Sequence, residues 1–178
     1  MGVLSLDSYV RQKFPKSVRY YKPGQKVPGQ FKALVLDANP FVYSAAMRVF
    51  EYGDGDCIIR QNDHIPYDKK IEMIFEDTWN QILDIIKVID CEEVFIAFDG
   101  VAPQSKQAQQ RCRRYPRSVP GEGEFDATHI STGTVFMHDL CSYVKFQIHK
   151  VQLNKKVIFL ATTLPEKESI KDSITCVL

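Results

Sequence analysis

The sequence lacks the patterns that mark several large classes of protein. Its five cysteines are an odd number among 178 residues, and no two of them form a C-x-x-C pair. A disulfide framework and a zinc site built on that pair are therefore not indicated. Neither a G-x-x-x-x-G-K-[ST] string nor a G-x-G-x-x-G string occurs, which argues against the common nucleoside-triphosphate and dinucleotide enzymes.

Long apolar runs are also missing. No stretch approaches the roughly 18 residues of a membrane span, and the N-terminus lacks the basic-then-apolar order of a secretory signal. Leu6 stands where a myristoylation start calls for Ser or Thr. We therefore expect a reduced, intracellular protein without a membrane partner, located in the cytoplasm, with the nucleus as the alternative.

The composition predicts one domain that spans residues 1–178. Apolar residues make up 44% of the chain and charged residues 25%, which is ordinary for a globular α/β protein rather than a disordered one. A chain of this size buries roughly 70% of the surface that it exposes when unfolded. Folding therefore requires neither disulfides nor a structural metal.

Three short apolar runs predict the strands of a mostly parallel sheet: residues 33–37, 94–99 and 157–161. Before the first run, Pro and Gly residues predict an irregular segment after a short helix. Helical patterns separate the runs, most clearly where isoleucines recur at three- and four-residue steps. The expected helices are 4–14, 41–52, 67–89, 104–115 and 135–149. The alternation predicts an α/β fold with three layers, α/β/α.

Asp37 and Asp99 each close one of these strands. Because ligands bind outside the carboxyl ends of parallel strands, we expect the two carboxylates to lie close together there. A divalent cation relieves their repulsion, and Mg²⁺ prefers one or two carboxylates together with water and substrate phosphate. The alternative is that each aspartate only caps the following helix. Two aspartates in matching positions favour a metal site.

A basic segment follows Asp99. The net charge of the chain is only +1, yet residues 104–117 contain no acid and five cations: Lys106, Arg111, Arg113, Arg114 and Arg117. At helical spacing Lys106, Gln110 and the Arg113-Arg114 pair fall on one side. The N-terminus of such a helix suits a terminal phosphate. A solvated basic helix is the alternative, and the nearness of Asp99 favours the phosphate site.

Several motifs occur in a fixed order along the chain. They are Met1-Gly2-Val3, Leu36-Asp37-Ala38-Asn39, D-G-V-A-P-x-x-K-x-x-x-Q-R-x-R-R from Asp99 to Arg114, Phe125-Asp126, Ile130-Ser131-Thr132-Gly133-Thr134 and Phe136-Met137. Together they resemble the N-terminal nuclease region of the Xrn-type 5′-to-3′ exoribonucleases. The resemblance covers nearly the whole chain up to Ala161 and implies a PIN/FEN-like nuclease core.

The resemblance implies an enzyme that hydrolyses RNA from a 5′-monophosphate end with Mg²⁺, or with Mn²⁺ in its place. Asp37 and Asp99 correspond to metal ligands of the family, and the 5′-phosphate pocket corresponds to Lys106, Gln110, Arg113 and Arg114. Tyr43 stands where the family has a histidine that stacks on the first base, and an aromatic face there is worth about 1–3 kcal/mol per base. The alternative for Tyr43 is an ordinary core aromatic.

The chain departs from the family pattern after the third strand. Where the family has P-G-E-G-E-H-K, this chain has Pro165-Glu166-Lys167-Glu168-Ser169. Glu166 and Glu168 are the corresponding catalytic metal ligands. The family's later aspartate pair and the second half of its base clamp would lie beyond Leu178. We therefore expect a further protein chain to supply that half, and weak or no turnover without it.

Two alternative functions are left open, the first by these departures and the second by the acidic α/β core that flap-type nucleases share. One is a catalytically inactive module that binds 5′ ends, which the altered glutamate motif favours. The other is a structure-specific DNA nuclease of the related flap type, which the residues of the phosphate pocket disfavour.

Overall fold

A parallel sheet forms the centre of the molecule. The computed structural model describes residues 5–51, 62, 64–100, 125–151, 153–161 and 176–177. The strands lie in the order β1–β2–β3–β4, the first three parallel and the last antiparallel to β3. Their bounds are β1 (Val27–Asp37), β2 (Ile89–Ala97), β3 (Lys156–Leu160) and β4 (Cys176–Val177). The predicted α/β class is confirmed.

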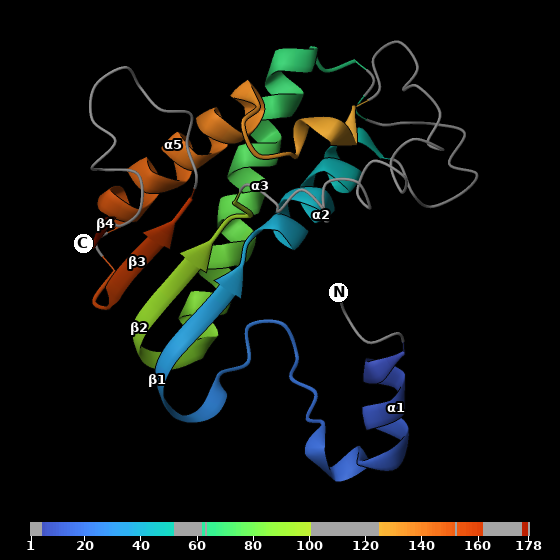
Figure 1. The fold of residues 1–178 in the computed structure, drawn as a ribbon, viewed down its shortest axis with the longest axis vertical. Coiled ribbons are helices and arrows are strands. Elements are labelled where there is room, and N and C mark those ends of the chain that lie inside the picture. The colour runs from blue at the N-terminus through green and yellow to red at the C-terminus, as the bar shows by residue number, and fades with distance from the viewer. Residues whose placement is uncertain are drawn as a thin grey trace.

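One face of the sheet carries the helical layer. Helix α3 (Tyr67–Val88) runs behind β1 and β2, with α2 (Asn39–Phe50) and α5 (Val135–Val151) on either side of it (Figure 1). The strand residues that face this layer are at most 7% exposed: Leu36, Val94, Ile96, Val157 and Phe159. On the opposite face Val35 is 71% exposed. The described residues therefore form the sheet and one of the two predicted helical layers.

The N-terminal segment is the least buried part of the described chain. It contains α1 (Leu6–Lys13) and a 3-10 turn, η1 (Pro15–Ser17), and neither has a buried residue. A second 3-10 turn, η2 (Ala127–His129), precedes α5. Among the described helices none combines the length and the apolar character needed to cross a bilayer.

The predicted elements differ from the structure mainly at their ends. β1 begins at Val27 rather than at residue 33, because Val27 and Phe31 pair with Ile89 and Cys91 of β2 despite Pro28 and Gly29, with a register shift between Val27 and Phe31. β2 ends at Ala97, so Asp99 lies two residues past the strand. Helix α2 begins at Asn39, since Pro40 fits the first turn of a helix. The predicted helix 104–115 lies outside the described residues.

Cys141 on α5 gives the fold a testable pH dependence. Its side chain is 3% exposed, and burial raises the pKa of the thiol from 9.0 to about 12, with Lys145 opposing the shift. At about pH 8 we expect iodoacetamide to leave Cys141 unmodified in the folded chain, because the thiolate is the nucleophile. In guanidinium chloride the same cysteine should react, as peptide mass spectrometry would show.

The same pKa difference predicts a loss of stability at high pH. The unfolded thiol ionises near its ordinary value while the folded thiol stays neutral, so the free energy of unfolding should fall as pH rises above about 9. A Cys141→Ala variant removes this contribution and should lose less stability between neutral pH and about pH 10 than the unsubstituted chain. Equal losses, or labelling of folded Cys141 as fast as in denaturant, would contradict the prediction.

Candidate active site

The two strand-end aspartates lie at the same edge of the sheet. Asp37 is the last residue of β1, and its register partner is Ala97, the last residue of β2. Asp99 follows two residues later, and both aspartates are exposed. The strand pattern correctly places them at the carboxyl ends of neighbouring parallel strands. Their role as metal ligands stays a prediction.

Asn39 connects the backbone around both aspartates. Its backbone amide donates to Oδ1 of Asp37 over 3.3 Å, and its own Oδ1 accepts a hydrogen bond from the amide of Asp99 over 3.2 Å. The asparagine begins α2 and is only 8% exposed. A single residue, through its backbone amide and its side-chain oxygen, thus connects the tips of β1 and β2. Sequence reasoning placed Asn39 inside a motif and assigned it no role.

The link through Asn39 predicts a measurable cost when it is broken. In an Asn39→Ala variant the Asp99 amide loses its acceptor, and we expect the free energy of unfolding to fall by about 1–3 kcal/mol. Asn80→Ala on the exposed side of α3 is the matched control and should change stability little. Urea unfolding of both variants measures the difference. Equal midpoints would show that this hydrogen bond contributes nothing.

The loop before α5 closes against Asp99. The hydroxyl of Thr132 lies 2.9 Å from the carbonyl oxygen of Asp99 and 3.0 Å from that of Gly100, and can donate to either. Thr134 caps α5, because its side-chain oxygen accepts from the amide of Met137 over 3.3 Å. Between them Gly133 has a φ of 88°, which glycine adopts without strain. This loop thereby fixes the backbone where the chain leaves β2.

Tyr43 lies on α2 and reaches toward the same loop. Its hydroxyl donates to the carbonyl of Ile130 over 3.4 Å, and its ring is half-buried against the core. The position is on the helix that Asn39 begins, and the ring keeps part of its surface in solvent. Stacking of Tyr43 on a base stays a prediction.

The other predicted site residues lie outside the described part of the chain. They are the predicted phosphate-pocket residues Lys106, Gln110, Arg113 and Arg114, and the predicted metal ligands Glu166 and Glu168. Within the described ranges no group of three or more His, Cys, Asp or Glu side chains could hold a metal. Asp37 and Asp99 do offer hard oxygen donors at an exposed edge. That set fits Mg²⁺, which commonly uses one or two carboxylates and retains water.

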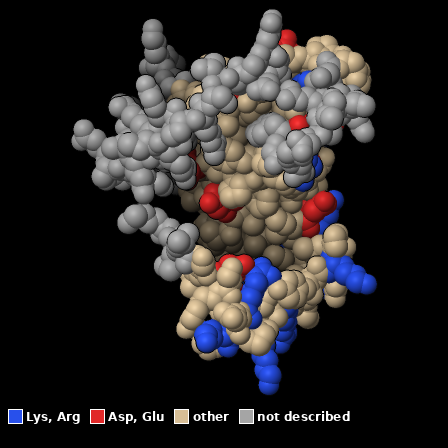
Figure 2. All heavy atoms as spheres, turned by 90° about the vertical axis from the view of Figure 1, so that its right-hand side faces the viewer, with Lys and Arg blue, Asp and Glu red and all other residues tan. Residues whose placement is uncertain are grey.

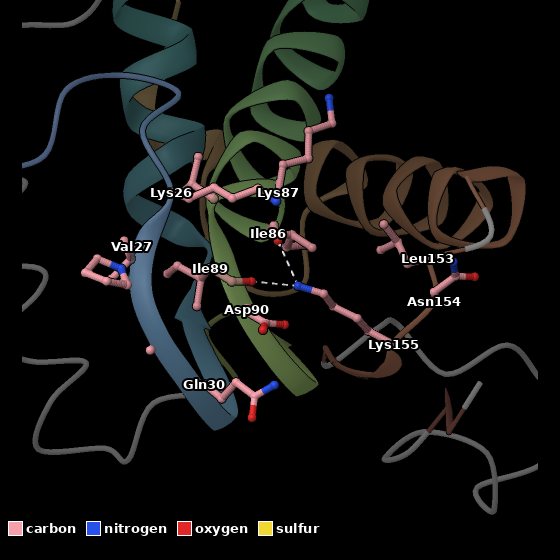
Figure 3. A pocket seen from close by; sticks show the side chains of 13 residues that line it. Lys26, Val27, Gln30, Ile86, Lys87, Ile89, Asp90, Leu153, Asn154 and Lys155 are labelled. Atoms are coloured by element: carbon pink, nitrogen blue, oxygen red, sulfur yellow. Dashed lines mark hydrogen bonds between the residues drawn. The ribbon is translucent and has the colours of Figure 1, made fainter.

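A pocket of about 670 Å³ lies at the opposite end of the strands, lined by residues around Val27, Ile89 and Lys155 (Figure 3). Lys155 donates from Nζ to the carbonyls of Ile86 over 3.0 Å and Ile89 over 2.7 Å. Its ammonium therefore satisfies carbonyl groups at the end of α3, where a cation also complements the helix dipole. The strands separate this pocket from Asp37 and Asp99, and it is not the candidate active site.

Comparison with known proteins gives one consistent result. The family model described as XRN 5′-3′ exonuclease N-terminus matches residues 1–164. The 5′-3′ exoribonuclease 1 of Homo sapiens is 27% identical over 173 residues, which cover 87% of this chain and 9% of that protein. The protein of the same name from Saccharomyces cerevisiae is 26% identical over 166 residues, covering 84% and 10%.

A third relative agrees with these two. The 5′-3′ exoribonuclease 1 of Schizosaccharomyces pombe is 23% identical over 170 residues, covering 86% of this chain and 12% of that protein. The chain thus spans about a tenth of the length of the curated relatives that it matches.

Proposed function

This chain belongs to the family of XRN 5′-3′ exonuclease N-termini, and we propose that it acts as a 5′-to-3′ exoribonuclease on 5′-monophosphorylated RNA. The observation that carries the proposal is the pair Asp37, which ends β1, and Asp99, which lies two residues past the parallel strand β2; Asn39 joins the two. An RNA terminus that reaches this edge meets two exposed carboxylates. The relatives named as 5′-3′ exoribonucleases support the same activity.

In the proposed reaction, acidic side chains position the metal ion beside the RNA. Asp37 and Asp99, with Glu166 and Glu168, would hold Mg²⁺. When bound, the ion stabilises negative charge on the phosphate and lowers the pKa of water. Asn39 keeps the two strand tips in register, so the carboxylates need little rearrangement before they bind.

Binding of the RNA end is assigned to the basic segment. Lys106, Gln110, Arg113 and Arg114 bind the terminal phosphate, since guanidinium groups make bidentate hydrogen bonds to phosphate oxygens. Tyr43 would stack on the first base. A phosphate held at this place sets which phosphodiester lies beside Asp37 and Asp99, and water is the attacking nucleophile.

A second candidate function is a 5′-end binding module without catalysis. It is favoured by the segment Pro165-Glu166-Lys167-Glu168-Ser169, which keeps two acids but lacks the glycines, histidine and lysine of the family motif. In this case the chain shields RNA ends. A further protein chain that supplies the remaining carboxylates would instead restore hydrolysis.

One assay separates the two candidates. The purified protein is incubated with RNAs of one sequence that carry either a 5′-monophosphate or a 5′-hydroxyl, in Mg²⁺ or in EDTA. Release of mononucleotides only from the phosphorylated RNA, and only with Mg²⁺, supports the exoribonuclease. Phosphate-selective binding without release supports the module. Equal affinity for both RNAs would reject the 5′-phosphate pocket.

A further inference from the structure

The first described residues hold a charge surplus that the net charge of the chain conceals. Residues 5–32, here called the basic arm, contain seven Lys and Arg and one acid, whereas the rest of the chain contains 16 Lys and Arg and 21 acids. A chain of net charge +1 thus divides into a cationic arm and an anionic remainder. The arm is therefore a second place, in addition to the basic segment 104–117, where a polyanion would be attracted.

The part of the basic arm before β1, residues 5–26, projects from the folded core (Figure 1). Its helix α1 and turn η1 bury no residue, and α1 stands apart from the sheet and the other helices (Figure 1). Figure 2 shows Lys and Arg gathered over this lower part of the molecule, away from the bulk of the core. All seven cations of the arm are exposed. The described core therefore buries none of these seven cations.

Most of this charge is available to a ligand. The single acid, Asp7, is paired with Nε of Arg11 at 2.7 Å, and the same guanidinium donates to the hydroxyl of Tyr20. None of the other six cations forms an ion pair with a described residue: Lys13, Lys16, Arg19, Lys22, Lys26 and Lys32. These six side chains can therefore bind phosphates without first breaking such a pair.

Aromatic rings alternate with these cations. Tyr9, Phe14, Tyr20 and Phe31 are 53%, 57%, 75% and 43% exposed. Surfaces that bind single-stranded nucleic acid combine cations along the backbone with aromatic faces on which bases stack. Large exposed rings set among lysines match that combination. Leu6, Tyr9 and Val10 share one face of α1, but the exposed rings of Tyr20 and Phe31 lie outside that helix, which favours a ligand with several bases over a membrane surface.

We propose that the basic arm is a second binding surface for single-stranded RNA, separate from the 5′ end site. The inference rests on the proposed function for the identity of the polyanion. The arm ends within β1, and because Val27 pairs with Ile89 and Asp37 with Ala97, that strand spans only about 26 Å between Val27 and Asp37. An RNA whose 5′ end lies at Asp37 reaches the start of that strand only if it extends several nucleotides further. The arm therefore acts on long RNA and not on the terminal nucleotide.

The test compares two variants with the same change in net charge. The arm variant carries Lys13→Gln, Lys16→Gln, Arg19→Gln and Lys22→Gln. The control variant carries Lys69→Gln, Lys87→Gln, Lys150→Gln and Lys156→Gln, all exposed and outside the arm. Fluorescence anisotropy in EDTA measures the binding of each variant to two ligands, an RNA of about 20 nucleotides and a dinucleotide. The RNA is longer than the roughly 4–16 nucleotides that one single-strand-binding fold covers. Circular dichroism checks that both variants are folded.

We expect the arm variant to bind the long RNA at least about tenfold more weakly than the control. The slope of log affinity against log salt should become shallower by about 0.7 for each phosphate that the arm no longer neutralises. Binding of the dinucleotide should not differ between the variants. Phe14→Ala should weaken binding of the long RNA about 5- to 140-fold, because its ring stacks on a base in this proposal. These readouts do not depend on cleavage or on a 5′-phosphate, so they stand even if the proposed exoribonuclease activity fails.

Three results would overturn the proposal. The first is equal affinity and equal salt slope for the arm and control variants. The second is an equal loss on the dinucleotide and the long RNA, which would place the arm at the 5′ end site. The third is a loss of binding to vesicles of anionic phospholipid with no loss on RNA, which would assign the arm to a membrane surface.

Discussion

A variant with both Asp37→Asn and Asp99→Asn is expected to release mononucleotides from 5′-monophosphorylated RNA at least about 100-fold more slowly than the unsubstituted protein. The reason is that a bound metal ion contributes several kcal/mol to stabilisation of the transition state, and neutral amides hold Mg²⁺ poorly. Both side chains are exposed, so the substitutions should leave stability nearly unchanged.

Metal binding tests this prediction independently of turnover. Mn²⁺ titration followed by electron paramagnetic resonance should show weaker binding in the double variant, even where hydrolysis by the chain alone is slow. The matched control replaces Asp84 and Asp139 with asparagine, two exposed aspartates on α3 and α5. Equal Mn²⁺ affinity in the double variant and the control would mean that the strand-end aspartates do not bind the ion.

The second large effect concerns the RNA end. Arg113→Ala combined with Arg114→Ala is expected to abolish the preference for a 5′-monophosphate over a 5′-hydroxyl. Hydrogen bonds to charged groups are worth about 1.5–3 kcal/mol each, so the two substitutions together should weaken binding of the phosphorylated RNA at least about 100-fold. Affinity for the 5′-hydroxyl RNA should change much less.

Competition binding with the two RNAs measures this preference directly. A control variant with Lys87→Ala and Lys150→Ala removes the same charge from exposed positions elsewhere and should keep the preference. Retention of the preference in the arginine variant would relocate the 5′-phosphate pocket away from the segment after Asp99.

The strand-end aspartates illustrate what the sequence can predict. Asp37 and Asp99 follow continuous apolar runs, and such runs mark strands buried in a parallel sheet. The position of both acids at one edge then follows from topology alone. The start of β1 was not predictable in the same way, because Pro28 and Gly29 disfavour a strand while pairing with β2 stabilises it.

The hydrogen bonds that hold the site together depend on tertiary structure. Asn39 bonds to a residue 60 positions away and Thr132 to one 33 positions away. Hydrogen bonds of this kind depend on how strands and loops are placed in space, and no periodic pattern records them. The basic arm is hard to predict from the sequence for another reason. Its prolines and glycines indicate irregular structure, and the nearly zero net charge of the chain hides its local surplus.

The outer edge of β1 limits the protein concentration at which assays can be run. Within the described residues β1 is the edge strand of the sheet, so its outer backbone groups are open to pairing with another strand. In the first half of β1, Pro28, a register shift and Lys32 disfavour pairing with a strand of another molecule. Among the described residues, the half near Val35 has no proline, register shift or lysine of this kind. Two copies that pair along this half of β1 would cover Asp37. Aggregation at high protein concentration would then appear in an assay as a loss of activity.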